Sequence, residues 1–143
     1  MAQSPIGHEV FTSNSATALH TPGEVVEIVD SSGLKRYKYI KFDNGSGDVA
    51  AAAGNIAYYF DGTDFDGITV TSDVSDTDKN LVAGVLQAVL TDQYYGWIQT
   101  WGYYAIVKTN GDDDIAAGDA IIGDGDGTCN STAQDTAPTN RVV

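Results

Sequence analysis

One stretch of this chain reads Tyr94-Tyr95-Gly96-Trp97-Ile98-Gln99-Thr100-Trp101-Gly102-Tyr103-Tyr104-Ala105-Ile106-Val107-Lys108. It holds both tryptophans and half of the eight tyrosines, and aromatic and β-branched residues of this kind are typical of strands. Strand alternation places one set of side chains on one face: Trp97, Gln99, Trp101, Tyr103, Ala105 and Val107. Both faces are largely apolar, which predicts a strand central in a sandwich or barrel, or one covered by a partner. Gly102 predicts a bulge or a close backbone approach at which the stretch bends or breaks.

The composition favours an all-β domain. Asp supplies 17 of the 20 acidic residues and Gly contributes 16 positions, and both residue types favour turns over helices. Turn signals recur every eight to twelve residues along the 143-residue chain, as they do in sandwiches and barrels. We therefore expect a small antiparallel sandwich or barrel, jelly-roll-like or β-tulip-like. An extended N-terminal arm over residues 1–23 would precede a single β domain over residues 24–143.

The charge and the remaining composition exclude several function classes. A net charge of −13 repels nucleic acid and anionic lipid, so neither is an expected partner. The chain has no apolar run long enough to span a membrane, and its first residues lack the pattern of a signal peptide. The single cysteine, Cys129, rules out an intrachain disulfide framework and fits a reducing compartment.

The predicted strands lie on either side of Asp- and Gly-rich turns. We expect a hairpin from residues 24–29 and 34–42, and further strands at residues 56–60, 67–72 and 81–90. Residues 81–90 have the length of a helix, but Gly84 and three valines favour a strand. The alanine run at residues 50–53 is interpreted as strand and loop, and a final strand is expected near Arg141.

Two segments are candidates for partner binding. The arm is interpreted either as a disordered terminus or as a segment that orders on a neighbouring subunit through Phe11 and Leu19. Four of the seven basic residues lie in the second predicted strand. They either offset the protein's own acids and protect an edge strand, or form a basic strip that docks on an acidic partner. These four are Lys35, Arg36, Lys38 and Lys41.

No motif in the chain selects a catalytic or cofactor site, and we expect neither enzymatic activity nor a cofactor. Residues 123–128 resemble the start of a calcium loop, but Cys129 occupies the position that requires Gly. A looser calcium site from Asp112, Asp113, Asp114, Asp124 and Asp126 remains an alternative to solvated turn acids. His8 and His20 lack a metal-binding or triad partner at the usual spacing, and nothing selects a pair of carboxylates for glycoside hydrolysis.

Three segments in order resemble tailed-bacteriophage capsid decoration proteins, also called cement or head-stabilising proteins. They are Lys79-Asn-Leu-Val-Ala-Gly-Val85, Tyr95-Gly-Trp-Ile-Gln-Thr-Trp-Gly102 and Ala116-Ala-Gly-Asp-Ala-Ile-Ile122. The polar arm that leads into Gly23-Glu-Val-Val and the basic-aromatic strand that ends at Phe42 are similar to the same family. The resemblance spans residues 21–122. The chain departs from the family pattern in its second tryptophan, Trp101, and in its Asp-rich loops.

The resemblance implies a dimeric or trimeric β protein on the outer surface of a virion. Such a protein, assembled in the host cytoplasm, binds over junctions between major capsid subunits. The arm and the basic strip would then face the shell, while Trp97, Trp101 and Tyr103 would supply core or oligomer contacts. Deleting residues 1–19 is then expected to abolish shell binding and leave the fold intact. A carbohydrate-binding or host-adhesion module that uses the same three aromatic residues is the alternative.

Overall fold

The computed structural model describes residues 11–60, 65–77, 81–111 and 121–131, and the predicted all-β class is confirmed. The elements are β1 (Val25–Asp30), β2 (Gly33–Phe42), β3 (Ile56–Tyr59), β4 (Thr69–Thr71), the 3-10 turn η2 (Val74–Asp76), β5 (Val82–Leu86), β6 (Tyr95–Trp101), β7 (Ile121–Gly123) and β8 (Cys129–Ser131). Within the described residues, no helix is long and apolar enough to cross a membrane.

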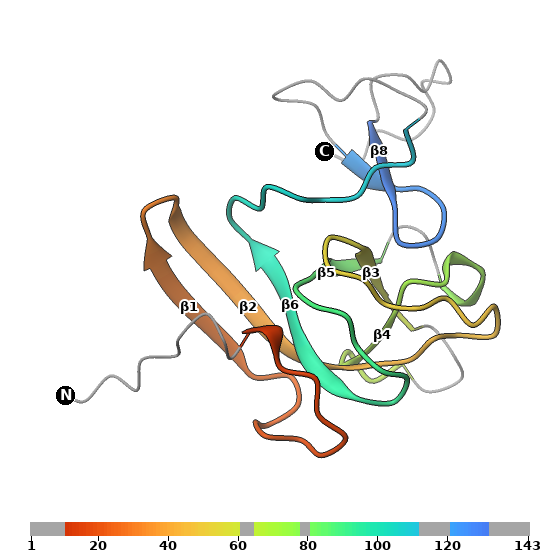
Figure 1. Ribbon diagram of the computed structural model, residues 1–143, viewed down its shortest axis with the longest axis horizontal. Helices are drawn as coiled ribbons and strands as arrows, with labels where there is room; N and C mark the ends of the chain where they lie inside the picture. The colour runs from red at the N-terminus through yellow and green to blue at the C-terminus, as the bar shows by residue number, and fades with distance from the viewer. Residues whose placement is uncertain (1–10, 61–64, 78–80, 112–120, 132–143) are drawn as a thin grey trace.

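Five of the strands close into a barrel. The order around the ring is β2-β4-β3-β5-β6, and β6 pairs back onto β2 to complete it (Figure 1). The β2–β4 pair is parallel, and the other pairs in the ring are antiparallel. The long strand β2 also pairs with β1, which lies outside the ring and extends the sheet as a hairpin. The molecule is therefore a barrel with an attached hairpin.

The barrel interior is apolar because alternate residues of its strands point inward. In β2 these are Ile40 and Phe42, which share the core with Val70, Leu86 and Ile98 of the neighbouring strands. Ala51 also packs into this core, although the alanine run forms a loop and contains no strand. Four consecutive alanines carry too little side-chain surface to favour a pleated strand.

A second, aromatic cluster covers the outside of β2 and β6. Phe11 stacks on Tyr37 with ring centroids 3.8 Å apart and meets Trp97 edge-on at 5.3 Å. Backbone hydrogen bonds join Ser15 and Tyr95, so residues 11–23 follow the barrel wall. The expectation that Phe11 binds a partner is therefore wrong: its ring is buried in the protein's own aromatic cluster. The arm's remaining residues, 1–10, lie outside the described residues.

The hairpin of β7 and β8 covers the outside of β3. Cys129 packs with Ile56 and Tyr58, and the Tyr58 hydroxyl contacts the carbonyl oxygens of Gly125 at 3.2 Å and Thr128 at 3.1 Å. Burial raises the pKa of Tyr58 to about 12, since the phenolate would be desolvated there. The sequence analysis assigned no strand to β8, whose short polar run has low strand propensity. The strand expected near residue 141 lies outside the described residues.

Strand β6 stops at Trp101, so the break predicted at the positive-φ residue Gly102 is confirmed. The stretch beyond it, to residue 108, is irregular and forms no second strand. The register with β2 also shifts: Gln99 lies opposite Tyr37, whereas Trp101 lies opposite Arg36. This bulge turns Trp101 to the other face of the sheet from Trp97. The expectation that both tryptophans share one face is therefore wrong.

Candidate functional site

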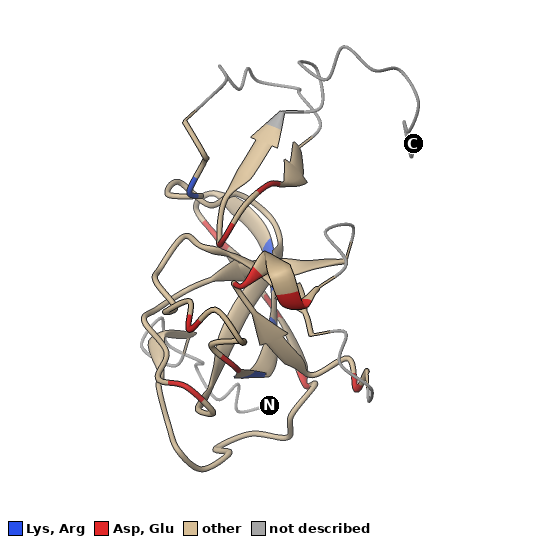
Figure 2. Ribbon diagram, turned by 90° about the vertical axis from the view of Figure 1, so that its right-hand side faces the viewer, with Lys and Arg blue, Asp and Glu red and all other residues tan. Residues whose placement is uncertain are grey.

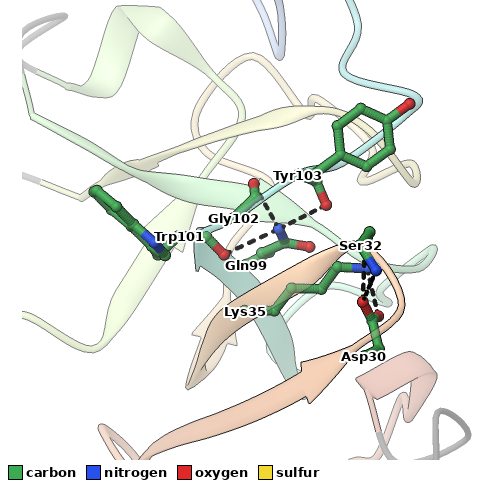
Figure 3. Close-up of polar contacts among 7 residues, drawn as sticks. All are labelled: Asp30, Ser32, Lys35, Gln99, Trp101, Gly102 and Tyr103. Carbon is green, nitrogen blue, oxygen red and sulfur yellow. Dashed lines mark hydrogen bonds and ion pairs between the residues drawn. The ribbon is translucent and has the colours of Figure 1, made fainter.

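The candidate site is the turn after β6, formed by Trp101, Gly102 and Tyr103 and named here the aromatic turn. The side chains of Trp101 and Tyr103 are 62% and 64% exposed. They project to opposite sides of the turn, as Figure 3 shows. Large aromatic side chains are normally covered, so two exposed rings two positions apart make this turn a candidate binding surface.

Gln99 fixes the aromatic turn from below. Its buried amide nitrogen, Nε2, donates to the carbonyl oxygens of Trp101, Gly102 and Tyr103 at 3.0, 2.9 and 3.2 Å (Figure 3). The two N–H groups of this amide are shared among three carbonyl oxygens, which ties the backbone of the turn to the buried side chain. The exposed rings therefore project from an ordered base, which lowers the entropy lost on binding.

Gly102 lets the aromatic turn approach the start of β2. Its φ is +97°, a conformation that residues with a Cβ rarely adopt. A Cβ at this position would also collide with the carbonyl oxygen of Leu34 and would lie 3.1 Å from Cα of Lys35. The close backbone approach predicted at Gly102 is thus confirmed, and its neighbour is the β1–β2 hairpin.

The aromatic turn lies beside an exposed face of the hairpin, named here the hairpin face. Residues directly opposite each other in an antiparallel pair point to the same side of the sheet. The pairs Val25–Lys38, Glu27–Arg36 and Val29–Leu34 therefore share a side with Trp101, which is opposite Arg36. The hairpin face consists of Val25, Glu27, Val29, Leu34, Arg36 and Trp101. Its apolar members are all exposed, and Val29 is 78% exposed.

An ion pair fixes the tip of the hairpin. Lys35 Nζ lies 2.8 Å from Asp30 Oδ2, and Ser32 donates to Asp30 Oδ1 from both its backbone nitrogen and its hydroxyl (Figure 3). These contacts hold the pKa of Asp30 well below its usual range, chiefly through Lys35. The same contact raises the pKa of Lys35. The turn at residues 30–33 predicted from the sequence is confirmed.

The four basic residues of β2 do not form one strip. Lys35 and Lys41 point to the aromatic side of the sheet, whereas Arg36 and Lys38 point to the other side. Lys35 pairs with Asp30, and Arg36 lies 2.6 Å from Glu27. Lys38 Nζ donates to the Tyr59 hydroxyl at 2.9 Å and to the Gly67 carbonyl at 2.6 Å. For the Lys41 side chain, the described part of the chain offers no hydrogen bond or ion pair, and its backbone nitrogen donates to the Ile68 carbonyl at 3.3 Å.

These partners decide between the two interpretations of the basic residues. Two of the four offset the protein's own acids, as the simpler interpretation predicts. Protection of an edge strand is not their role, since β2 has a neighbouring strand on each side. Figure 2 shows acidic positions spread over the loops and only isolated basic ones. A continuous basic surface is therefore not available on β2.

The other residues predicted to make contacts differ in position and in exposure: Trp97 is buried, whereas Leu19, Trp101 and Tyr103 are exposed. Trp97 is 1% exposed and belongs to the aromatic cluster, so its predicted core role is confirmed. Leu19 is exposed, and its backbone nitrogen donates to the Tyr39 hydroxyl at 3.1 Å. With Trp97 buried and the rings of Trp101 and Tyr103 directed apart, the three aromatic residues do not form one platform for stacking on a sugar.

The acidic and thiol candidates have structural partners where they are described. The Asp124 carboxylate accepts from Asn110 at 2.6 Å, and that of Asp126 accepts from the backbone nitrogen of Val74 at 3.0 Å. Burial raises the pKa of the Cys129 thiol, which lowers its reactivity. His20 lies 3.6 Å from Glu24 and meets the rings of Tyr39 and Trp97.

No group of three potential metal ligands occurs among the described residues. Asp112, Asp113, Asp114 and His8, which the sequence analysis named, lie outside them. The calcium alternative, which depends on the first three, therefore stays a prediction.

Sequence reasoning missed three features of the site. It took Gln99 as one more strand residue, and it named neither Val25 nor Val29. A signal for the valines was present, because residues 25–29 are apolar at four of five positions in a strand with one face to bury.

No protein-family model, curated protein sequence or solved structure matches the chain.

Proposed function

We propose that this protein is a structural virion protein that binds the outer surface of a bacteriophage capsid and stabilises it by clamping neighbouring major capsid subunits. The observation that carries the proposal is the aromatic turn, in which Gln99 fixes a backbone that exposes Trp101 and Tyr103. The resemblance of residues 21–122 to capsid decoration proteins supports the choice of a capsid as partner. The role is one of binding, with neither catalysis nor a cofactor.

The aromatic turn supplies the kind of contact that dominates protein interfaces. Tryptophan and tyrosine are enriched among the residues that carry most of the binding energy. A tryptophan buries about 150–250 Å² at roughly 25 cal/mol per Å², so covering the exposed 62% of Trp101 contributes about 2–4 kcal/mol. One copy thus needs only a modest interface, and many copies on one shell make its opening break many contacts at once.

The proposed contact surface differs from the one predicted by the sequence. Phe11 is buried and three of the four basic residues of β2 have partners within the protein. We therefore place the shell contact on the aromatic turn. Leu19 is exposed next to Tyr39, and Lys41 lies opposite Tyr95, at the other end of β6 from Trp101. The net charge of −13 favours an apolar or basic patch on the capsid as the complementary surface.

Co-sedimentation with empty expanded phage heads tests the proposal. The wild-type protein should co-sediment with the shells, and Trp101→Ala should weaken binding at least tenfold without changing the unfolding temperature. Val89→Ala is the matched control, since Val89 is 66% exposed in the loop before β6 and lies away from the aromatic turn. Full-strength binding by a Trp101→Ala/Tyr103→Ala double variant would contradict the proposal. Saturable glycan binding that Trp101→Ala removes would support the carbohydrate-binding alternative instead.

A further inference from the structure

Strand β1 is the free edge of the sheet. It pairs with β2 alone, and no strand of the described chain lies along its outer side (Figure 1). The backbone nitrogen of Tyr39 donates to the Glu24 carbonyl at 2.8 Å, so the backbone carbonyl of Glu24 points toward β2. Hydrogen-bonding direction alternates along an antiparallel strand. The backbone N–H and C=O groups of Val25, Glu27 and Val29 therefore point outward.

Among the residues that the structure describes, this edge lacks most of the usual protection against pairing. Natural edge strands carry lysine, proline or a bulge, or are covered by another segment. β1 has none of the first three: it reads Val-Val-Glu-Ile-Val-Asp and pairs with β2 in one unbroken register. Its one central charge, Glu27, is paired with Arg36. Its outward-facing residues Val25 and Val29 are also exposed on the hairpin face. Open backbone groups and exposed valines on one strand fit a further β-strand as the partner.

The sequence of β1 identifies which strand fits. Residues 25–29 read nearly the same in both directions, with a β-branched residue at each position on either side of Glu27. An antiparallel copy of the same strand, related by a two-fold axis at Glu27, would place Val25 opposite Val29 of the second copy. On the other face, Val26 would lie opposite Ile28 of the second copy. Such self-complementarity is what a two-fold symmetric interface requires.

We propose that this protein self-associates through β1, which pairs antiparallel with β1 of a second copy about a two-fold axis at Glu27. The outward-facing backbone groups of the central residues then all gain partners. The two Glu27 side chains face each other across the axis, and each is already 2.6 Å from its own Arg36. The row across the interface thus reads Arg, Glu, Glu, Arg. Two like charges directly opposite each other are unfavourable, and each arginine offsets the charge of the glutamate next to it.

The pairing would join two barrels through one continuous sheet and give the assembly two aromatic turns. Two linked binding ends raise the apparent affinity for a repetitive surface without any new contact to it. The dimer does not depend on what the aromatic turn binds. Its test therefore uses the purified full chain alone, and its failure would leave the proposed function untouched.

Sedimentation velocity over a range of concentrations measures the association. Wild-type protein should form a dimer, and Val29→Lys should raise the dissociation constant at least tenfold. The double variant Val25→Glu/Val29→Lys should restore the dimer, because the new carboxylate of one copy then faces the new ammonium group of the other. Val89→Lys adds the same charge at a comparably exposed position outside β1 and should leave the dimer intact.

Loss of the dimer can be distinguished from unfolding, because Val29 is 78% exposed and its replacement should leave the barrel folded. Circular dichroism of the variant checks this. A wild-type protein that stays monomeric at all concentrations overturns the proposal. A dimer that Val29→Lys leaves unchanged overturns it as well. Loss of the dimer in Val29→Lys without recovery in the double variant overturns the register centred on Glu27, and with it the proposed interface.

Discussion

Two tryptophans of one strand, four residues apart, have opposite environments. Trp97 is enclosed by Phe11, Tyr39 and His20 on the outer wall of the barrel. Trp101 stands 62% exposed beside the β1–β2 hairpin. The register shift opposite Arg36 and Tyr37 separates them, because one extra residue in a strand reverses the side to which later side chains point. The comparison teaches that β6 has two parts: the part around Trp97 packs in the fold, whereas the end at Trp101 is exposed and free to bind.

The largest effect we expect is on stability, from Trp97. Trp97→Ala would leave a cavity in the aromatic cluster and lower the free energy of unfolding by about 3–5 kcal/mol. Trp101→Ala should change it by no more than about 0.5 kcal/mol, as for other exposed positions. Urea unfolding of the two variants measures the difference. Equal losses from both would contradict the division of β6.

The next largest effect concerns the segment that covers Trp97. Phe11→Ala should lower the free energy of unfolding by about 3 kcal/mol, because the Phe11 ring packs against Tyr37 and Trp97. Leu19→Ala, an exposed position in the same segment, is the matched control and should cost less than about 0.5 kcal/mol. For the same reason, deletion of residues 1–19 should destabilise the barrel, contrary to the sequence-based expectation. An unchanged unfolding midpoint after the deletion would instead support the sequence-based expectation that the fold does not need residues 1–19.

A smaller effect tests the connection between the aromatic turn and the hairpin. Gly102→Ala should cost about 2 kcal/mol, since it combines a left-handed backbone with a collision at the Leu34 carbonyl. Gly111→Ala shares the positive φ, +81°, but would meet no atom of the described residues within 4 Å, and should cost about 1 kcal/mol. Thermal unfolding of the pair isolates the contribution of the close approach. Equal losses of stability in the two variants would show that close contact between the aromatic turn and β2 adds nothing to the cost of Gly102→Ala.

The smallest effect is a pH dependence at the hairpin tip. Lys35 lowers the pKa of Asp30 in the folded state, so the contact stabilises the protein above the unfolded pKa of about 4. This contribution is lost as pH falls below about 4 toward the folded pKa. Asp30→Asn should therefore lower the unfolding temperature at pH 7. Between pH 4 and pH 2, the unfolding temperature of the variant should fall less than that of the wild type. Parallel curves for variant and wild type would contradict this assignment.

The local elements of the fold were accessible from sequence. The hairpin of β1 and β2 and the start of β6 follow from alternation and turn residues, which act over short distances. Ring closure through the β2–β6 pair was not accessible, because it joins residues some sixty positions apart. β8 carries no strand signal in its polar run and forms because Cys129 packs on Tyr58.

The candidate site was predicted only in part. The importance of residues 94–108 and the break at Gly102 follow from composition and glycine chemistry. The exposure of Trp101 depends on a bulge, and a bulge of one residue leaves no distinct pattern in a strand that is apolar on both faces. The two interpretations of the basic residues of β2 could not be separated from sequence, because the acidic partners of Lys35 and Arg36 come from the adjacent strand.

Tryptophan fluorescence tests the division of β6 most directly. In Trp97→Phe the indole of Trp101 is the sole tryptophan reporter, and its emission should be that of an exposed ring. On addition of empty phage heads we expect the emission to shift to shorter wavelength, because the shell covers the ring. The complementary variant Trp101→Phe should show a buried indole whose emission does not respond to shells. A Trp101 signal that stays unchanged while the protein binds the shells would contradict the account.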